Sequence, residues 1–283
     1  MTSTAKNKKP ASERITIARC AGFCGGVAIA VKSAEKLLAE NEVFCIGDII
    51  HNSFVIEALK NRGLKIVSGV EDIPGRAHVI IRAHGLPSGE IARLRKKRCV
   101  IHDLTCPILK KIHTNIKKLK RQGYKIAIVG NPAHAEVEAF VSRSGEGVSV
   151  ISEIRDSANL PYVSKRAVIC QSTISSGLFV EMAAKTLGKS LETLVIDTIC
   201  GEAKKRRKEA NALAKKSKMV IIVGDRKSSN TMTLAGVVGK HCSVTLISSA
   251  DEIKKNKIRY PLAIVSGASS PRELVLDIAR KVC

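Results

Sequence analysis

Residues 100–106 read VIHDLTC, and residues 194–200 read LVIDTIC. Each stretch begins with apolar residues typical of a strand, continues with Asp-x-x-Cys, and leads into a basic segment with a helical pattern. A weaker third copy, residues 15–24 (ITIARCAGFC), has the strand and the cysteine but no aspartate. The final cysteines are 106 − 24 = 82 and 200 − 106 = 94 residues apart. Repeats of this size predict three similar α/β lobes, each with a cysteine at a strand end.

Apolar runs of four to six residues alternate with longer helical patterns along the chain. Such runs are typical of parallel strands buried on both faces, so the sequence predicts an α/β fold with mostly parallel sheets. If the lobes pack about a pseudo-threefold axis, their cysteines meet in a central cavity. The runs are EVFCIG (42–47), AHVIIRA (77–83), KIAIVG (125–130), AVICQ (167–171), LVIDTI (194–199), MVIIVG (219–224), VTLIS (244–248) and LAIVSG (262–267).

No linker rich in Pro, Gly or Ser separates the lobes, so we expect one compact body. The predicted division has a disordered basic tail and three lobes. The tail is residues 1–12, the first lobe 26–106, the second 107–199, and the third 200–283 together with 13–25.

The chain is strongly basic, with 48 Lys and Arg against 25 Asp and Glu and a net charge of +23. This charge favours an anionic partner, either nucleic acid or a phosphorylated metabolite. The basic clusters lie in helical segments, where solvated helix faces are the favoured explanation. Only eight aromatic residues and no Trp occur, which disfavours a surface for base stacking.

The nine cysteines are an odd number in a chain too long for a small disulfide scaffold, so free thiols in a reducing compartment are expected. No apolar run approaches the roughly 18 residues that a membrane helix needs. The first residues also lack the apolar core of a secretory signal. These features predict a cytoplasmic protein that does not enter a membrane.

Three converging thiolates from Cys24, Cys106 and Cys200 have three explanations. A zinc site would need a fourth ligand, such as a histidine. An iron-sulfur cluster held by three cysteines would leave one iron open to a substrate. The third explanation is three buried core cysteines. Cys20 has no counterpart in the other copies, so it is predicted not to be a ligand.

Polar residues recur in the turns that follow the predicted strands: His51, His84, His134, Ser228, Ser229, Asn230 and Ser269. Imidazoles, hydroxyls and backbone N–H groups at helix starts suit a phosphate or diphosphate, and ligands of parallel sheets bind at strand ends. Helix capping is the alternative for each turn. Glu136 is a candidate general acid, or a carboxylate that stabilises a helix start.

Together these segments resemble the 4-hydroxy-3-methylbut-2-enyl diphosphate reductases, the IspH/LytB family. Nine short motifs in the same order along the chain carry the resemblance. They are GFCGGV at Cys24, HNSFV at His51, AHGL at His84, TCP at Cys106, HAEVE at His134 and Glu136, QSTIS at Ser172 and Thr173, DTIC at Cys200, KSSN at Ser228 to Asn230, and GASSP at Ser269.

The resemblance implies a three-lobed α/β reductase that converts 4-hydroxy-3-methylbut-2-enyl diphosphate to isopentenyl and dimethylallyl diphosphate, the last step of the non-mevalonate pathway. It implies a 4Fe-4S cluster with three cysteine ligands and one open iron, held by Cys24, Cys106 and Cys200. An external donor of the ferredoxin or flavodoxin type would reduce the cluster.

By the same resemblance, Glu136 supplies protons, while Ser172 and His134 order the substrate hydroxyl. The residues that would bind the diphosphate are His51, His84, His134, Ser228, Ser229, Asn230 and Ser269, with Thr173 nearby. Two segments differ from the family pattern, the turn at 131–135 and the helix start at 201–207. A divergent paralogue that acts on another substrate therefore stays an alternative, as does a basic nucleic-acid-binding protein.

Overall fold

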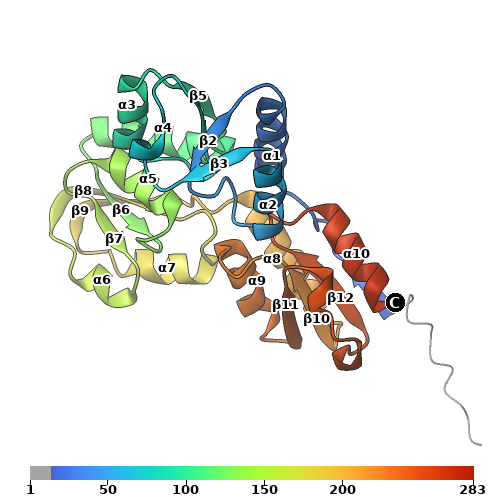
Figure 1. The fold of residues 1–283 in the computed structure, drawn as a ribbon. Coiled ribbons are helices and arrows are strands. Elements are labelled where there is room, and N and C mark those ends of the chain that lie inside the picture. Colours follow the sequence, from blue (N-terminus) through green and yellow to red (C-terminus); the bar gives the residue numbers. More distant parts are fainter. Residues whose placement is uncertain (1–13) are drawn as a thin grey trace, which may run out of the picture. The chain divides into compact units, whose positions relative to one another are not determined.

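The computed structural model describes residues 14–283, so the predicted tail lies outside the described residues. The described chain contains three four-stranded sheets in which every strand pairing is parallel (Figure 1). The predicted α/β class with parallel sheets is therefore confirmed. The pseudo-threefold axis and the central cavity stay predictions.

The chain divides into two compact units, and each unit is made of segments that are separated in the sequence. Within the described residues, unit 1 comprises residues 14–23, 52–54 and 204–283, and unit 2 comprises residues 24–51 and 55–203. The predicted lobe boundaries stay a prediction.

The sheet of unit 1 has the strand order β1-β12-β10-β11. Every residue of the central strands β10 and β12 is buried, as expected for parallel strands covered on both faces. A core of aliphatic side chains surrounds them, with Val275 and Ile278 of α10 among its members. The strands are β1 (Ile15–Ile17), β10 (Met219–Val223), β11 (Ser243–Ile247) and β12 (Leu262–Ser266).

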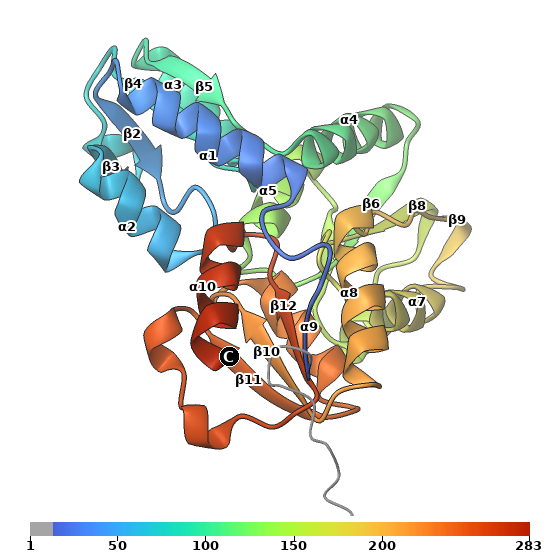
Figure 2. The ribbon, with the colours of Figure 1, turned by 90° about the vertical axis from the view of Figure 1, so that its right-hand side faces the viewer.

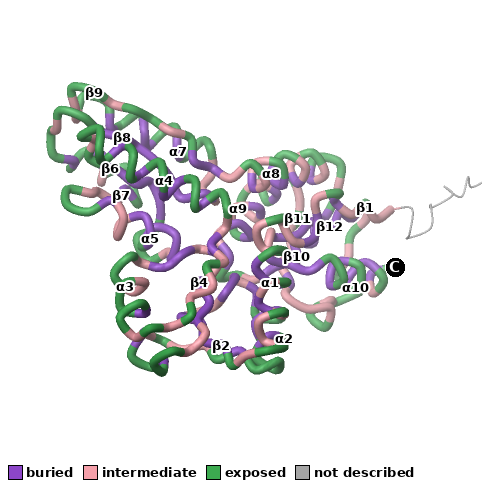
Figure 3. Tube along the Cα trace, turned by 90° about the horizontal axis from the view of Figure 1, so that it is seen from above, coloured by how far each residue is buried: buried purple, intermediate pink, exposed green. Residues whose placement is uncertain are grey.

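Unit 2 contains the other two sheets. Their strand orders are β3-β2-β4-β5 and β7-β6-β8-β9. The inner strands are buried along most of their length, which Figure 3 shows as purple segments. The strands are β2 (Val43–Ile46), β3 (Leu64–Val67), β4 (His78–Ile81), β5 (Val100–Asp103), β6 (Lys125–Val129), β7 (Ser149–Ile151), β8 (Val163–Cys170) and β9 (Ser190–Val195).

Helices connect successive parallel strands, because a parallel pairing requires a crossover. Helix α4 illustrates their pattern, since Leu109, Ile112 and Ile116 are buried on one face while its lysines are exposed. The helices are α1 (Gly25–Leu38), α2 (Ser53–Asn61), α3 (Ser88–Lys96), α4 (Pro107–Arg121), α5 (Ala135–Ser144), α6 (Ile154–Ala158), α7 (Ser176–Ala184), α8 (Gly201–Ala214), α9 (Ser229–Val238) and α10 (Arg272–Val282).

The strand predicted at 194–199 is wrong in its position and its burial. Strand β9 ends at Val195, because Asp197 accepts the backbone N–H of Ile199 (3.0 Å) and turns the chain. Strand β9 also lies at the edge of its sheet and is largely exposed. The apolar residue Ile199 is buried in the turn that follows, which explains why the pattern resembled a longer strand. Strands β3 and β7 were not identified from the sequence.

Candidate functional site

The three predicted cysteines occupy equivalent places in the fold. Helices α1, α4 and α8 begin directly after Cys24, Cys106 and Cys200. All three cysteines belong to unit 2. A helix start presents backbone N–H groups and a positive dipole end, both of which stabilise a thiolate. The sequence repeat therefore corresponds to a repeated local structure.

The aspartates of the repeat have a structural role. Asp103 accepts the backbone N–H of Thr105 (3.0 Å), and Asp197 accepts that of Ile199 at the same distance. Each aspartate thereby forms an Asx turn, which directs the chain toward the cysteine one residue further on. This function explains the Asp-x-x-Cys spacing.

The first turn of α1 lies against Cys106. A Cβ built on Gly26 would stand 2.7 Å from the Cys106 Sγ, so only glycine leaves room for this sulfur. Figure 2 shows the starts of α1 and α4 side by side. Burial raises the pKa of the Cys106 thiol, and the neighbouring thiols of Cys24 and Cys200 raise it further. The backbone N–H groups that follow Cys106 act in the opposite direction.

The donor set fits an iron-sulfur cluster. The thiols of Cys24 and Cys200 act electrostatically on that of Cys106, and each of the three stands at a helix start that can stabilise negative charge. In residues 14–283, no group of three or more His, Cys, Asp and Glu side chains is arranged to hold a single metal ion. A cluster of several irons holds its thiolates farther apart than one zinc ion does.

Cys20 differs from these cysteines. It belongs to unit 1, where the carboxylate of Glu209 accepts the backbone N–H groups of Arg19 (2.7 Å) and Cys20 (3.1 Å). Burial and the hydrogen bond to Glu209 raise the pKa of the Cys20 thiol to about 12. A thiol held in the protonated form is a poor metal ligand. This environment supports the prediction that Cys20 is not a ligand.

The three predicted histidines lie together in unit 2. The rings of His51 and His84 stack with centroids 4.3 Å apart, and His134 lies edge-on to both at 5.6 and 5.7 Å. Burial lowers the pKa of His84 well below its usual value and lowers that of His134 to about 4, and the neighbouring imidazoles contribute. The buried Nδ1 of His84 has no hydrogen-bond partner within the described part of the chain.

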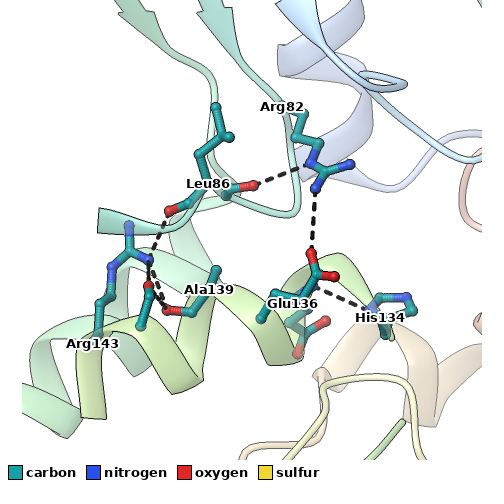
Figure 4. Close-up of polar contacts among 9 residues, drawn as sticks. Arg82, Leu86, His134, Glu136, Ala139 and Arg143 are labelled. Carbon is teal, nitrogen blue, oxygen red and sulfur yellow. Dashed lines mark hydrogen bonds and ion pairs between the residues drawn. The ribbon is translucent and has the colours of Figure 1, made fainter. Parts of the chain in front are cut away.

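His134 also caps helix α5, as the capping alternative expected. Its Nδ1 accepts the backbone N–H of Glu136 at 3.2 Å, which fixes the ring with Nδ1 as the acceptor (Figure 4). The cap uses Nδ1 and not the other ring nitrogen, Nε2. Capping and ligand binding are therefore compatible at this residue.

Sequence reasoning missed Arg82, which lies two residues before His84. Its Nε donates to the carbonyl of Gly85 (3.3 Å), and its Nη2 lies 3.9 Å from a Glu138 carboxylate oxygen (Figure 4). The Arg82 guanidinium further lowers the pKa of His84 and of His134. A single arginine after a buried strand gave a weak signal, because the chain has so many basic residues.

Glu136 is buried and bound to Ser172. The two Glu136 carboxylate oxygens accept the Ser172 backbone N–H (2.5 Å) and its hydroxyl (2.8 Å). Burial raises the pKa of Glu136 to about 7, although both hydrogen bonds from Ser172 act to lower it. A carboxyl group with this pKa can hold and release a proton near neutral pH.

Backbone hydrogen bonds connect these groups to the cysteines. The N–H of Cys106 donates to the carbonyl of Ala83 (3.0 Å), the residue before His84. The N–H of Cys200 donates to the carbonyl of Ser172 (2.9 Å). Two of the three cysteines are therefore bonded directly to the segments that carry His84 and the Ser172 partner of the buried acid. Thr173 lies beside them and accepts a hydrogen bond from the Gln171 amide (2.8 Å).

The remaining predicted residues belong to unit 1. The Ser228 hydroxyl caps helix α9 by accepting the N–H of Thr231 (3.4 Å), and Ser229 is the first residue of that helix. The side-chain amide of Asn230 is buried, and neither its oxygen nor its nitrogen has a hydrogen-bond partner within residues 14–283. Ser269 is also buried, in the turn after β12. A buried amide without partners suits a polar ligand.

The described chain has three parallel β-sheets with thiols, imidazoles and a buried acid after their strands. These features define a class of α/β protein whose side chains suit the binding of metals and anions. The family model described as "LytB protein" matches residues 15–283, and the chain belongs to this family. No helix within residues 14–283 has the length and apolar character needed to cross a membrane.

Relatives of known name match over nearly their full length. The 4-hydroxy-3-methylbut-2-enyl diphosphate reductase of Geobacter sulfurreducens is 34% identical over 272 residues, which cover 95% of this chain and 96% of the relative. The reductase of the same name from Clostridioides difficile is 32% identical over 270 residues, covering 93% and 97%.

Solved structures also match. One described as (E)-4-hydroxy-3-methyl-but-2-enyl diphosphate reductase, the terminal enzyme of the non-mevalonate pathway, has a TM-score of 0.72 at 30% identity, covering 95% of this chain and 98% of that one. The E-1-hydroxy-2-methyl-but-2-enyl-4-diphosphate reductase of Plasmodium falciparum has a TM-score of 0.88 at 22% identity, covering 94% and 86%. The second likeness concerns the fold alone.

Proposed function

We propose that this chain is a 4-hydroxy-3-methylbut-2-enyl diphosphate reductase of the non-mevalonate isoprenoid pathway. The reaction adds two electrons and two protons to the substrate, breaks its allylic C–O bond, and releases water and either isopentenyl or dimethylallyl diphosphate. Relatives that carry this name match the chain over nearly its full length. The observation that carries the proposal is the buried Glu136, with a pKa raised to about 7, in the unit that also holds the three thiols.

In this proposal Cys24, Cys106 and Cys200 hold a 4Fe-4S cluster with one open iron. When bound, the cluster supplies electrons and a Lewis acid for the substrate hydroxyl. The helix starts beside the cysteines favour the thiolate forms that such ligation needs, and Gly26 leaves space around the Cys106 sulfur. Two observations support this assignment. Each of the three cysteines directly precedes a helix, and all three belong to unit 2.

Glu136 is the proposed proton donor to the departing oxygen. Its hydrogen bonds from Ser172 fix the orientation of the carboxyl group, and its burial keeps the proton bound close to neutral pH. Ser172 and His134 order the hydroxyl end of the substrate. The serine hydroxyl can also return a hydrogen bond when Glu136 is protonated.

The diphosphate is assigned to the polar groups in the turns that follow the strands. Two observations support the assignment, namely the unpartnered Nδ1 of His84 and the unpartnered buried amide of Asn230 in the described chain. Neutral imidazoles can take up protons when a diphosphate approaches, because a nearby negative charge raises their pKa. The proposed binding residues are His51, His84, His134, Thr173, Ser228, Ser229, Asn230 and Ser269.

The electrons must come from outside the protein, and we assign them to a one-electron carrier of the ferredoxin or flavodoxin type. A basic protein of net charge +23 would attract an acidic carrier by long-range electrostatics. A cytoplasmic location is part of the same proposal.

Anaerobic turnover tests the proposal. Protein purified without oxygen should be brown and should convert 4-hydroxy-3-methylbut-2-enyl diphosphate to the two products with dithionite and a viologen as reductant. A reconstituted protein that binds iron but leaves this substrate unchanged would support the divergent-paralogue alternative. A protein that stays free of iron would refute the cluster.

A matched pair of variants tests the ligand set. Cys24→Ser should lose the colour and most of the iron, whereas Cys20→Ser should keep both, because the Cys20 thiol is bound to Glu209. Iron and sulfide analysis and the visible absorption spectrum measure the difference. Equal losses in the two variants would contradict the assignment.

A further inference from the structure

A cavity of about 370 Å³ in unit 2 is lined by basic side chains and by no Asp or Glu of the described residues. Its lining residues come from α3, α4 and α5, and α5 packs against both of the other helices (Figure 1). This volume is at the lower end of the range found for pockets that hold small molecules. The lining residues are Ser88, Lys117, Lys120, Arg121, Ser142 and Arg143.

The four cations of this cavity lack acidic partners. None of them forms an ion pair with an acid of residues 14–283. Burial lowers the pKa of the Arg143 guanidinium, and Asp103 acts in the opposite direction. The Asp103 carboxylate is already engaged elsewhere, because it lies 3.2 Å from the Lys110 Nζ and accepts the backbone N–H of Thr105. The positive charge of the cavity is therefore not neutralised by side chains.

Helix ends account for only part of this charge. Lys120 and Arg121 lie in the last turn of α4, and Arg143 lies in the last turn of α5. The end of a helix is equivalent to roughly half a negative charge, so two ends balance about one of the four cations. The start of α3 at Ser88 adds positive charge instead. The cavity therefore keeps an excess of about three positive charges.

The donors that stay open to a ligand are ammonium and guanidinium groups. The Ser88 hydroxyl donates to the Ser142 carbonyl (3.0 Å), and the Ser142 hydroxyl donates to the Ala139 carbonyl (3.0 Å). Arg143 is held by its Nη1, which donates to the carbonyls of Leu86 (2.9 Å) and Ala139 (2.8 Å) (Figure 4). Its Nε and Nη2 make no hydrogen bond within the described residues. These two nitrogens form one edge of the guanidinium and can donate two parallel bonds to a phosphate.

The cavity is separate from the cysteines. Lys120 stands 120 − 107 = 13 residues after Pro107, the first residue of α4, which corresponds to a rise of about 20 Å along the helix. None of the six lining residues belongs to the proposed catalytic or diphosphate-binding groups. A ligand of this cavity is therefore a molecule other than a substrate held beside Cys106.

We propose that this cavity is a binding site for a small molecule that carries two or more phosphate groups. Several negative charges are needed to match the excess of positive charge, and two arginines suit the paired oxygens of phosphate. The volume of the cavity limits the ligand to a small molecule.

Isothermal titration calorimetry of the full chain with inorganic triphosphate tests this proposal. The double variant Lys120→Gln/Arg121→Gln should bind the probe about tenfold more weakly than the wild type, or weaker still. The control Lys111→Gln/Lys118→Gln removes the same charge from the same helix, at two exposed residues that do not line the cavity. Its affinity should stay close to that of the wild type. The proposed active site is intact in both variants, so any binding there contributes equally.

Equal affinities of the cavity variant and the wild type would overturn the proposal. So would equal losses in the two double variants, because they would show only a general attraction to a basic chain. Citrate that binds as tightly as triphosphate would overturn the assignment to phosphate. Circular dichroism of each variant checks that a loss of binding does not come from unfolding.

Discussion

Replacing Glu136 with glutamine should stabilise the protein at alkaline pH while leaving its stability at acid pH nearly unchanged. Burial raises the pKa of Glu136 from 4.5 to about 7 in the folded chain. Below pH 4.5 the carboxyl is protonated in both states. Between 4.5 and 7 the unfolded chain releases a proton that the folded chain keeps, so stability falls as pH rises. Above 7 the penalty is complete, and the difference corresponds to about 3 kcal/mol.

Glutamine imitates the neutral form of this carboxyl. Its oxygen can accept the backbone N–H of Ser172, and its amide nitrogen can donate to the Ser172 hydroxyl, so the local hydrogen bonds persist. The stability difference between Glu136→Gln and the wild type should therefore grow from near zero at pH 4 to a gain of up to about 3 kcal/mol at pH 8. The same substitution removes the proposed proton donor and should lower turnover about 10²- to 10⁴-fold.

Urea unfolding followed by far-ultraviolet circular dichroism at several values between pH 4 and 8 measures the difference. Glu138→Gln is the matched control, since Glu138 lies on the same helix with 47% of its side chain exposed. Its stability difference should be small and vary little with pH. A constant difference between Glu136→Gln and the wild type across this range would refute the reasoning, as would the same trend in the control.

Two further predictions concern neighbouring groups. Gly26→Ala should lower the iron content, because its Cβ would stand 2.7 Å from the Cys106 sulfur. The control Gly25→Ala should keep its iron, because a Cβ at Gly25 would have no atom within 4 Å. Equal iron contents in the two variants would contradict the reasoning. Arg82→Gln removes a cation that lowers the pKa of His134, so this pKa should rise from about 4, and an unchanged histidine titration by NMR would contradict it.

Much of the fold could be predicted because parallel strands buried on both faces leave a clear apolar signal. Strands β6, β10 and β12 have this pattern and are buried along nearly all of their length. Strand β7 has only three residues, and β3 is only partly buried, so neither produced a recognisable run. The apparent strand at 194–199 failed because an aspartate turn with a buried isoleucine has the same local composition as a strand end.

The sequence predicted those parts of the candidate site in which the spacing of residues along the chain reflects local structure. The Asp-x-x-Cys repeat could be detected because the same Asx turn precedes Cys106 and Cys200. The environment of Glu136 could not be predicted in this way. The carboxylate is buried and accepts hydrogen bonds from Ser172, a residue 36 positions away in the sequence. Arg82 was missed for a related reason, because its importance depends on a neighbour in helix α5 and not on its own sequence context.

The net charge of the chain and the charge of the site arise from different residues. The lysines of α4 are exposed while its apolar face is buried, so much of the basic excess belongs to solvated helix surfaces. In unit 2, burial disfavours charge on His84, His134 and Glu136. Desolvation therefore sets the protonation states at the site, whereas the exposed lysines and arginines govern long-range attraction. A ligand that brings negative charge to the histidines favours their protonated forms, so we expect its binding to be coupled to proton uptake and to depend on pH.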